Sequence, residues 1–166
     1  MEKIEPKIIH GAQEDVTIRE VHEKDAEAFR SIRKHSVQEQ PDSFVCVDEY
    51  LQDFDRSKEE MCKYVREFDQ NPKALILGAE RPDGTFIGKC RTFVYKPEID
   101  PHTAYLGGVY VQKEYRSTGI GQALVDSVYA FWAKHKEVNK LIGTVIERNK
   151  GMVRFWEKRG YKRNGF

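Results

Sequence analysis

The spacing of apolar and polar side chains divides the chain into strands and helices. Apolar and polar side chains alternate over residues 16–21, which is the pattern of a half-buried strand. Apolar positions 29, 32 and 37 follow Asp25 and Glu27, whose acidic side chains favour the first turn of a helix that ends before Pro41. Residues 1–15 show no period, so we predict a flexible tail ahead of a single domain at 16–166.

Two further helices are indicated between this helix and the next strand. Apolar residues from Val47 to Phe54 recur at i, i+3, i+4 and i+7, the spacing of a short helix. Ser57 and Glu60 have the spacing of a capping box, which predicts that a second helix begins there. Its apolar stripe runs through positions 61, 64, 65 and 68, and Asn71-Pro72 ends it.

The middle of the chain predicts a hairpin and a central strand. Residues 74–79 and 85–95 flank the turn Arg81-Pro82-Asp83-Gly84, and Asp-Gly is a strong hairpin signal. A loop then leads to an apolar strand at 105–111. Gly107-Gly108 interrupts that strand, which indicates a bulge or the close approach of a ligand to the backbone.

A polar turn, Tyr115 to Gly121, joins this strand to an amphipathic helix with apolar positions 124, 128, 131 and 132. The first N–H groups of a helix lack partners within it, and the helix dipole favours an anion there. Gly119 and Gly121 allow close approach to the backbone, and Arg116 supplies a fixed charge. The turn is therefore a candidate pyrophosphate site, with an ordinary strand-to-helix turn as the alternative.

The turn does not match the two best-known nucleotide motifs. Leu124 stands at the third glycine position of GxGxxG, and GxxxxGK[ST] is absent. After the helix, residues 141–146 form an apolar run that predicts a strand parallel to 105–111, so the unit is βαβ. A short helix with Met152, Phe155 and Trp156 on its buried face follows and ends at Gly160.

Composition excludes several classes of protein. The 166 residues fit one domain, and 39% of them are apolar. We find neither a membrane-spanning run nor a secretory signal, which predicts a cytoplasmic protein without a membrane partner. The three cysteines and five histidines are scattered, so we expect no metal site. A net charge of +1 argues against nucleic-acid binding.

Charge is nevertheless distributed unevenly along the chain. Residues 1–70 carry 11 basic and 18 acidic side chains, whereas residues 134–166 carry 10 basic and 3 acidic ones. The difference suits a polyanionic cofactor at the C-terminal part and a cationic amine at the N-terminal part. The alternative is that the two parts attract each other when they pack.

Two stretches together resemble the acetyl-CoA-binding motifs of the GNAT superfamily of N-acetyltransferases. The first is Arg116-x-x-Gly119-x-Gly121 after Val109-x-Val111, and the second is Asn149 followed by residues 155–161, Phe-Trp-Glu-Lys-Arg-Gly-Tyr. The resemblance covers roughly residues 74–161. It implies a mixed α/β (α+β) fold of the GNAT-like acyl-CoA N-acyltransferase type, with about six strands and about four helices.

The resemblance also implies acetyl-CoA as cosubstrate and an acceptor that is a small-molecule or peptide amine. Phe44, Tyr50 and Phe54 become candidate acceptor contacts, with core packing as the alternative. The implied cofactor-binding residues are Val109, Tyr110, Val111, Arg116, Ser117, Thr118, Gly119, Ile120, Gly121, Asn149, Trp156 and Lys158.

The chain departs from the family at positions that carry proton transfer. Many members have a tyrosine where this chain has Trp156, and an indole cannot protonate a departing thiolate. Tyr110, Tyr129 and Tyr161 are the candidate acids by residue type, of which Tyr110 and Tyr161 are retained, with a structural role as the alternative for each. The identity of the general base is also unassigned, because no acidic side chain lies between Thr103 and Val111. Direct attack by the amine, aided by positioning and by main-chain N–H groups, is the predicted chemistry.

Two other functions are compatible with these motifs. One is a non-catalytic acyl-CoA-binding or sensing module, which Trp156 favours, and the other is a nucleotide-binding interaction protein. The family usually continues with a hairpin after Tyr161, where this chain has five more residues. Either that strand is cut from this chain, or another subunit covers the exposed edge in a homodimer.

Overall fold

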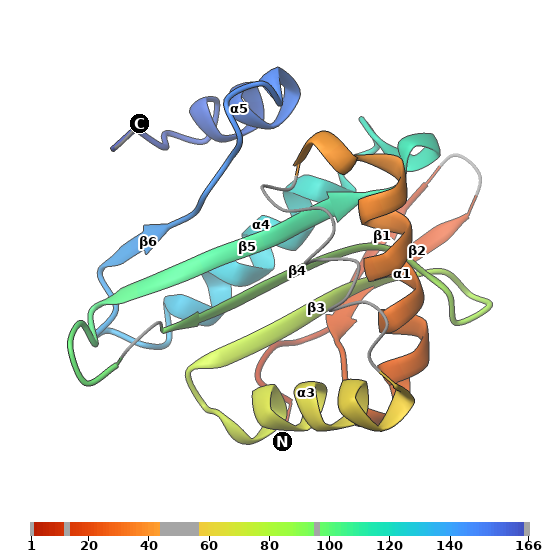
Figure 1. The fold of residues 1–166 in the computed structure, drawn as a ribbon, viewed down its shortest axis with the longest axis horizontal. Coiled ribbons are helices and arrows are strands. Elements are labelled where there is room, and N and C mark those ends of the chain that lie inside the picture. The colour runs from red at the N-terminus through yellow and green to blue at the C-terminus, as the bar shows by residue number, and fades with distance from the viewer. Residues whose placement is uncertain (1, 12–13, 44–56, 95–96, 165–166) are drawn as a thin grey trace.

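A computed structural model of the chain describes residues 2–11, 14–43, 57–94 and 97–164 (Figure 1). The strands are β1 (Lys7–His10), β2 (Asp15–Glu20), β3 (Ala74–Glu80), β4 (Phe86–Val94), β5 (Thr103–Val111) and β6 (Lys140–Ile142). The α-helices are α1 (Ala26–Glu39), α3 (Lys58–Gln70), α4 (Ile120–Trp132) and α5 (Lys150–Glu157). Short 3-10 turns are η1 (Glu23–Asp25), η2 (Pro41–Ser43) and η3 (Lys113–Tyr115).

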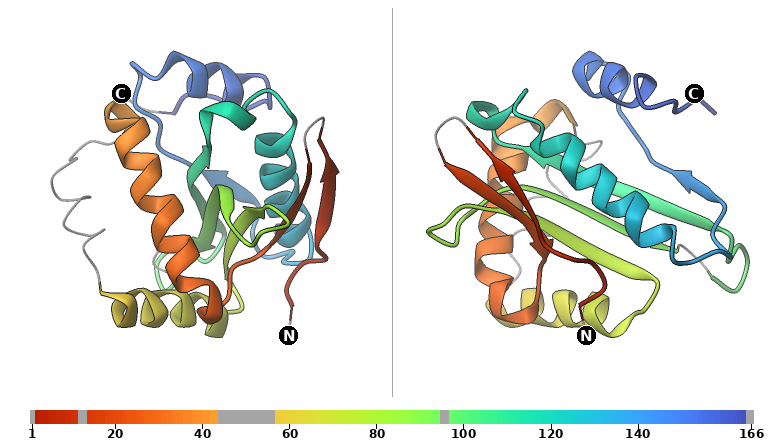
Figure 2. Two further views of the ribbon diagram at one scale, coloured as in Figure 1. Left: turned by 90° about the vertical axis from the view of Figure 1, so that its right-hand side faces the viewer. Right: turned by 180° about the vertical axis from the view of Figure 1, so that it is seen from behind.

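The six strands form one sheet in the order β1-β2-β3-β4-β5-β6. Neighbours from β1 to β5 are antiparallel, whereas β5 and β6 are parallel, as a helical crossover between them requires. Helices α1 and α3 cover one face and α4 covers the other (Figures 1 and 2). The mixed α/β architecture predicted from the sequence is confirmed.

Each face of the sheet has its own apolar core. On the α4 face, the fully buried Leu124, Val128 and Phe131 pack against strand residues such as Leu77 and Leu106. The other face packs α1 and α3 against the sheet, and its buried residues are Val21, Ala26, Phe29, Ile32, Met61, Val65, Ile76, Phe86 and Tyr110. The sheet is therefore covered on both sides, which explains why β3 has no exposed position.

Local signals in the sequence are confirmed where they involve the backbone directly. Ser57 and Glu60 form the reciprocal capping box at the start of α3. The turn at 81–84 closes the β3–β4 hairpin, with Gly84 N–H donating to the Arg81 carbonyl at 3.0 Å. The helix predicted within residues 47–54 lies outside the described residues. None of the described helices combines the length and apolar character that crossing a bilayer requires.

Two boundaries differ from the sequence predictions. The last strand ends at Ile142 rather than at residue 146, because the backbone leaves β5 after three residue pairs and residues 143–146 line a cavity instead. Residues 7–10, predicted as part of a flexible tail, form β1 and pair with β2. A strand of four residues, of which only Ile9 is partly buried, is too short to give a readable period.

The segment before β1 is held in place by hydrogen bonds of the Lys3 side chain and of the Lys3 and Ile4 backbone amides. The Lys3 ammonium donates to the carbonyls of Phe68, Asn71 and Ala74 at 2.7–2.9 Å. The carboxylate of Glu20, only 4% exposed, accepts the Lys3 and Ile4 amides. Ile4 itself is buried in the core. The prediction of a flexible tail is therefore wrong for this segment.

Replacing Glu20 with Ala is expected to lower the free energy of unfolding by about 1–3 kcal/mol, because the buried amide of Ile4 and the part-buried amide of Lys3 lose their acceptor. Urea denaturation followed by circular dichroism measures the change. Glu5→Ala is the matched control, since Glu5 is exposed and next to the same segment, and it is expected to stay within about 0.5 kcal/mol of the wild type. Equal stability of both variants would contradict the anchoring role of Glu20.

Candidate functional site

The turn between β5 and α4 holds an unusual backbone conformation. Ser117 has φ 65°, and Gly119, at the N-cap of α4, has φ 90°, where a β-carbon would be strained. The Thr118 hydroxyl donates to the Tyr115 carbonyl at 2.5 Å and fixes the turn. The first hydrogen bond of α4 runs from the Ala123 amide to the carbonyl of Gly119, its N-cap, at 2.9 Å.

This conformation leaves a run of backbone donors without protein acceptors. Among the described residues, the amides of positions 117–122 donate to no protein acceptor. Three of these positions, 120–122, form the first turn of α4, where the helix dipole adds partial positive charge. A β-carbon at Gly119 would meet nothing within 4 Å, so the turn is open on its outer side. These donors fit an anion such as a diphosphate.

A cavity of about 520 Å³ lies against this turn. Its other wall is α5, which contributes Gly151, Met152 and Phe155. Two guanidinium groups line it. That of Arg116 donates to the Val111 carbonyl at 2.9 Å and pairs with Glu39 of α1, and that of Arg159 stacks 3.4 Å over the Phe155 ring. The cavity is therefore lined by two fixed positive charges, one of which is paired with a carboxylate.

A second cavity of about 180 Å³ adjoins the first, because five residues line both. It lies between β5 and the segment after β6, on the side of α1 and α3. The shared residues are Gln40, Val109, Tyr110, Asn149 and Met152. A ligand bound at the α4 turn can thus extend along β5 into the second cavity.

A bulge in β5 lies where the cavities meet. The pairing register with β4 shifts between Lys89 and Arg91, which confirms the bulge predicted from Gly107-Gly108. Gly108 adopts φ 64°, and its carbonyl accepts a hydrogen bond from the Lys89 ammonium at 3.1 Å. Lys89 lines the smaller cavity, and burial, followed by Arg33 and Arg91, lowers its pKa to about 7.

The aromatic candidates occupy different places. Trp156 lines the smaller cavity and packs edge-on against Tyr161, whose ring centroid lies 4.8 Å away. Tyr161 itself lines neither cavity. Burial, and then the Glu39 carboxylate, raises the pKa of Tyr110, and burial raises that of Tyr161. A phenol with a raised pKa gives its proton to a thiolate less readily, so both are poor general acids.

Most residues that the motif resemblance assigns to the cofactor are brought together. Lining one or both cavities are Val109, Tyr110, Val111, Arg116, Ser117, Gly119, Gly121, Asn149 and Trp156. Thr118 and Ile120 contribute backbone to the turn without lining either cavity, and Lys158 at the end of α5 lines neither. Phe44, Tyr50 and Phe54 lie outside the described residues.

Sequence reasoning missed most of the charged and amide side chains at the cavities, among them Arg33, Gln40, Lys89, Arg91, Gln122 and Arg159. A signal existed for Lys89, which interrupts the apolar strand at 86–94. The basic excess after residue 134 was a diffuse signal for Arg159. Gln40 and Gln122 carry no local signal, because only the packing of α1 and α4 places them at the site.

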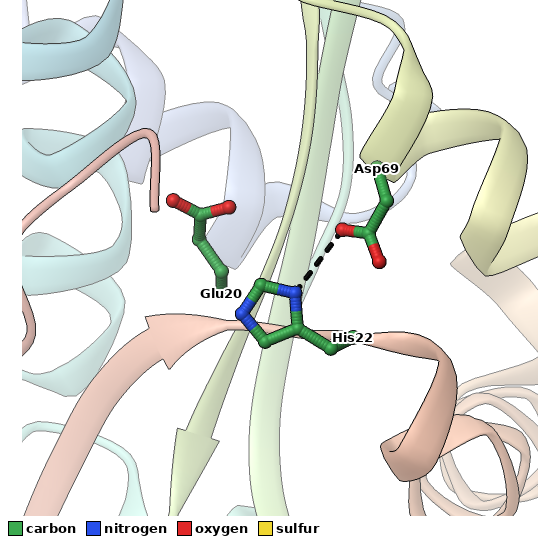
Figure 3. Close-up of side chains that lie close together, drawn as sticks. All are labelled: Glu20, His22 and Asp69. Atoms are coloured by element: carbon green, nitrogen blue, oxygen red, sulfur yellow. Dashed lines mark hydrogen bonds and ion pairs between the residues drawn. The ribbon is translucent and has the colours of Figure 1, made fainter. Parts of the chain in front are cut away.

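One group of side chains away from the cavities has metal-ligand chemistry. Ligand atoms of Glu20, His22 and Asp69 lie within 4.8 Å of one another, and His22 stands between the two carboxylates (Figure 3). Glu20 already accepts the amides of Lys3 and Ile4. Burial lowers the pKa of Lys3, and the charges of Glu20 and Asp69 oppose that shift. Asp69 also pairs with His22 at 3.2 Å, so both carboxylates already have partners within the protein.

Comparisons with known proteins agree with this geometry. A search of curated proteins gives no match. Among solved structures, an acetyltransferase of the GNAT family from Streptococcus pneumoniae is similar, with a TM-score of 0.77, 22% identity, and coverage of 90% of this chain and 86% of that one. Glucosamine-6-phosphate N-acetyltransferase from Arabidopsis thaliana has a TM-score of 0.66 and 17% identity, with coverage of 91% and 94%.

A third similar structure is an aminoglycoside N-acetyltransferase, AAC(6')-Iy, in complex with CoA, with a TM-score of 0.67, 17% identity, and coverage of 91% and 90%. At these identities the structures share the fold. The family model described as "Acetyltransferase (GNAT) family" matches residues 29–161, which is most of the chain and includes both cavities and the turn before α4. The chain therefore belongs to the GNAT acetyltransferase family.

Proposed function

We propose that this protein transfers an acetyl group from acetyl-CoA to a primary amine by direct attack of the amine on the thioester. The observation that carries the proposal is the junction of two cavities at the β5 bulge, one beside the unpaired amides of residues 117–122 and the other facing α1 and α3. Such a layout lets donor and acceptor bind together, which direct transfer needs.

The larger cavity suits the coenzyme by its chemistry. Its amide donors and the guanidinium of Arg159 complement a diphosphate, and Val109 to Val111 offer an extended backbone along which a pantetheine arm can run. The residues assigned here to the coenzyme are Val109, Tyr110, Val111, Arg116, Ser117, Gly119, Gly121 and Asn149. The acetyl-CoA supplies an activated acyl group, and the protein supplies position and N–H donors.

The acceptor belongs in the smaller cavity. Aminoglycosides and glucosamine 6-phosphate, the substrates named for two structural neighbours, are both amines of small molecules, and we infer an acceptor of that size. Phe29 and Tyr64 contribute aromatic rings from α1 and α3, with the Arg33 guanidinium 5.8 and 5.1 Å from their centres, and Trp156 contributes an indole from α5. An amine that carries an apolar or planar group next to its nitrogen fits this lining.

Thiol release tests the function directly. Isothermal titration is expected to show acetyl-CoA binding in preference to ATP, and a panel of primary amines with acetyl-CoA is expected to yield at least one acceptor that releases CoA thiol. Binding without release, across small-molecule and peptide amines, would favour a non-catalytic acyl-CoA sensor. Preference for ATP would refute the proposal.

The anion-binding turn is tested by one added charge. Gly121 is the second residue of α4 and lines the larger cavity, and a β-carbon there would make ordinary contact with Phe155 at 3.5 Å. Gly121→Asp is expected to leave stability intact, because an acid in the first turn suits the helix dipole. It should weaken CoA binding at least about tenfold relative to the isosteric Gly121→Asn, through repulsion of the diphosphate.

Calorimetry with CoA measures both affinities, and urea denaturation confirms that both variants are folded. Since the two side chains have the same shape, their difference isolates charge. Equal affinities of the aspartate and asparagine variants would show that no phosphate lies near the start of α4.

A further inference from the structure

Lys89 is a buried ionisable group within the smaller cavity. It stands on β4 opposite Tyr110 of β5, directly before the bulge, and only 7% of the residue is exposed. Lysine is almost never this buried unless a charge partner compensates it. Its ammonium donates to the Gly108 carbonyl at 3.1 Å and lies 5.9 Å from the centre of the Tyr110 ring. It forms no ion pair with a carboxylate of the described residues.

The groups around Lys89 are basic or neutral on every element that packs against it. Arg33 faces it from α1, and Arg91 and Cys90 are its neighbours on β4. Tyr64 of α3 lines the same cavity, as does Tyr110. The Glu39 carboxylate lies beyond Tyr110 and pairs with Arg116. The surroundings therefore disfavour the charged form of the amine.

Burial is the largest cause of the depressed pKa of Lys89, about 7, and the charges of Arg33 and Arg91 add to it. A pKa lowered toward neutral pH makes the neutral amine accessible under working conditions. A neutral lysine offers a lone pair, and Lys89 lines the cavity to which the acceptor is assigned. An aliphatic side chain would fill the same space without the cost of burying an amine.

We propose that Lys89 is the general base of the reaction: its neutral amine takes the proton that an acceptor ammonium must lose before it attacks the thioester. This role rests on the proposed function. The position agrees with it, because Lys89 lies on the α1 and α3 side of the sheet, next to the bulge where the two cavities meet. A base with a pKa near the working pH is the most effective kind.

The step balances in protons and bonds. The acceptor ammonium gives one proton to Nζ of Lys89, and the freed nitrogen forms a bond to the acetyl carbon. The carbon–sulfur bond breaks, and the second proton on nitrogen passes to the thiolate to give CoA thiol. Lys89 then returns its proton to water, so that the products are the N-acetyl amine, CoA thiol and one proton.

The protonation of Lys89 is measurable without an acceptor. Between pH 7 and the ordinary lysine pKa of 10.5, the unfolded chain binds a proton that the folded chain lacks, so the stability of the wild type rises with pH in this window. Methionine does not titrate. The gain in unfolding free energy of Lys89→Met over the wild type should therefore be largest below pH 7 and shrink toward pH 9.5. A gain that is constant from pH 6 to 9.5 would overturn the proposal.

Steady-state kinetics provide a second test of Lys89. They use acetyl-CoA and the amine of the panel that gives the fastest thiol release. Lys89→Met should lower kcat/KM about 100-fold at pH 7, and the loss should narrow toward pH 9.5, where free amine forms in water. Lys89→Arg keeps the charge but cannot accept a proton in this range, so an equal loss is expected. CoA affinity should stay within twofold in both variants.

Lys63→Met is the matched control, since Lys63 is exposed on α3, and wild-type kinetics are expected of it. Turnover by Lys89→Met with the pH profile of the wild type would refute the role of Lys89 and leave acetyl transfer standing. Full activity of Lys89→Arg would do the same. Failure of the wild type to bind acetyl-CoA would instead refute the proposed function and the base with it.

Discussion

The early separation of β5 from β6 is the constraint on which the site depends. The strands pair only at Thr103–Lys140, Ala104–Leu141 and Tyr105–Ile142. Beyond these pairs β5 continues to Val111, while the other segment crosses to α5 (Figure 1). Backbone groups that a longer ladder would use are thus available to a ligand, and both cavities lie in this opening. The site is built from main chain as much as from side chains.

The sequence could predict backbone features that depend on residues close together in the chain. The capping box of α3, the Asp-Gly hairpin turn, the bulge at Gly107-Gly108 and the glycine turn before α4 each depend on neighbouring residues. Features that depend on distant residues were not predictable. The pKa of Lys89 depends on Arg33 of another helix, and Arg159 reaches Gln122 across the larger cavity. Strand β1 likewise depends on Glu20 and on its partner strand.

Acidic residues of the first part of the chain pair with bases from its middle. Glu14 pairs with Arg81 and Glu39 with Arg116, and neither arginine belongs to the basic part at 134–166. These exposed or half-exposed pairs contribute modestly. At the smaller cavity the charge is basic, because its described lining includes Lys89 and two arginines and no carboxylate. The acidic excess of residues 1–70 therefore does not place carboxylates along the described lining of this cavity.

The contacts of Lys3 determine when the first residues of the chain can join the fold. Its ammonium binds carbonyls that lie 65 to 71 positions later, at the end of α3 and the start of β3. During synthesis this lysine has no partner until α3 has left the ribosome. Long-range contacts of this kind form slowly, since a large loop must close first. The N-terminal strand is thus expected to dock late, on a sheet already nucleated by the β3–β4 hairpin.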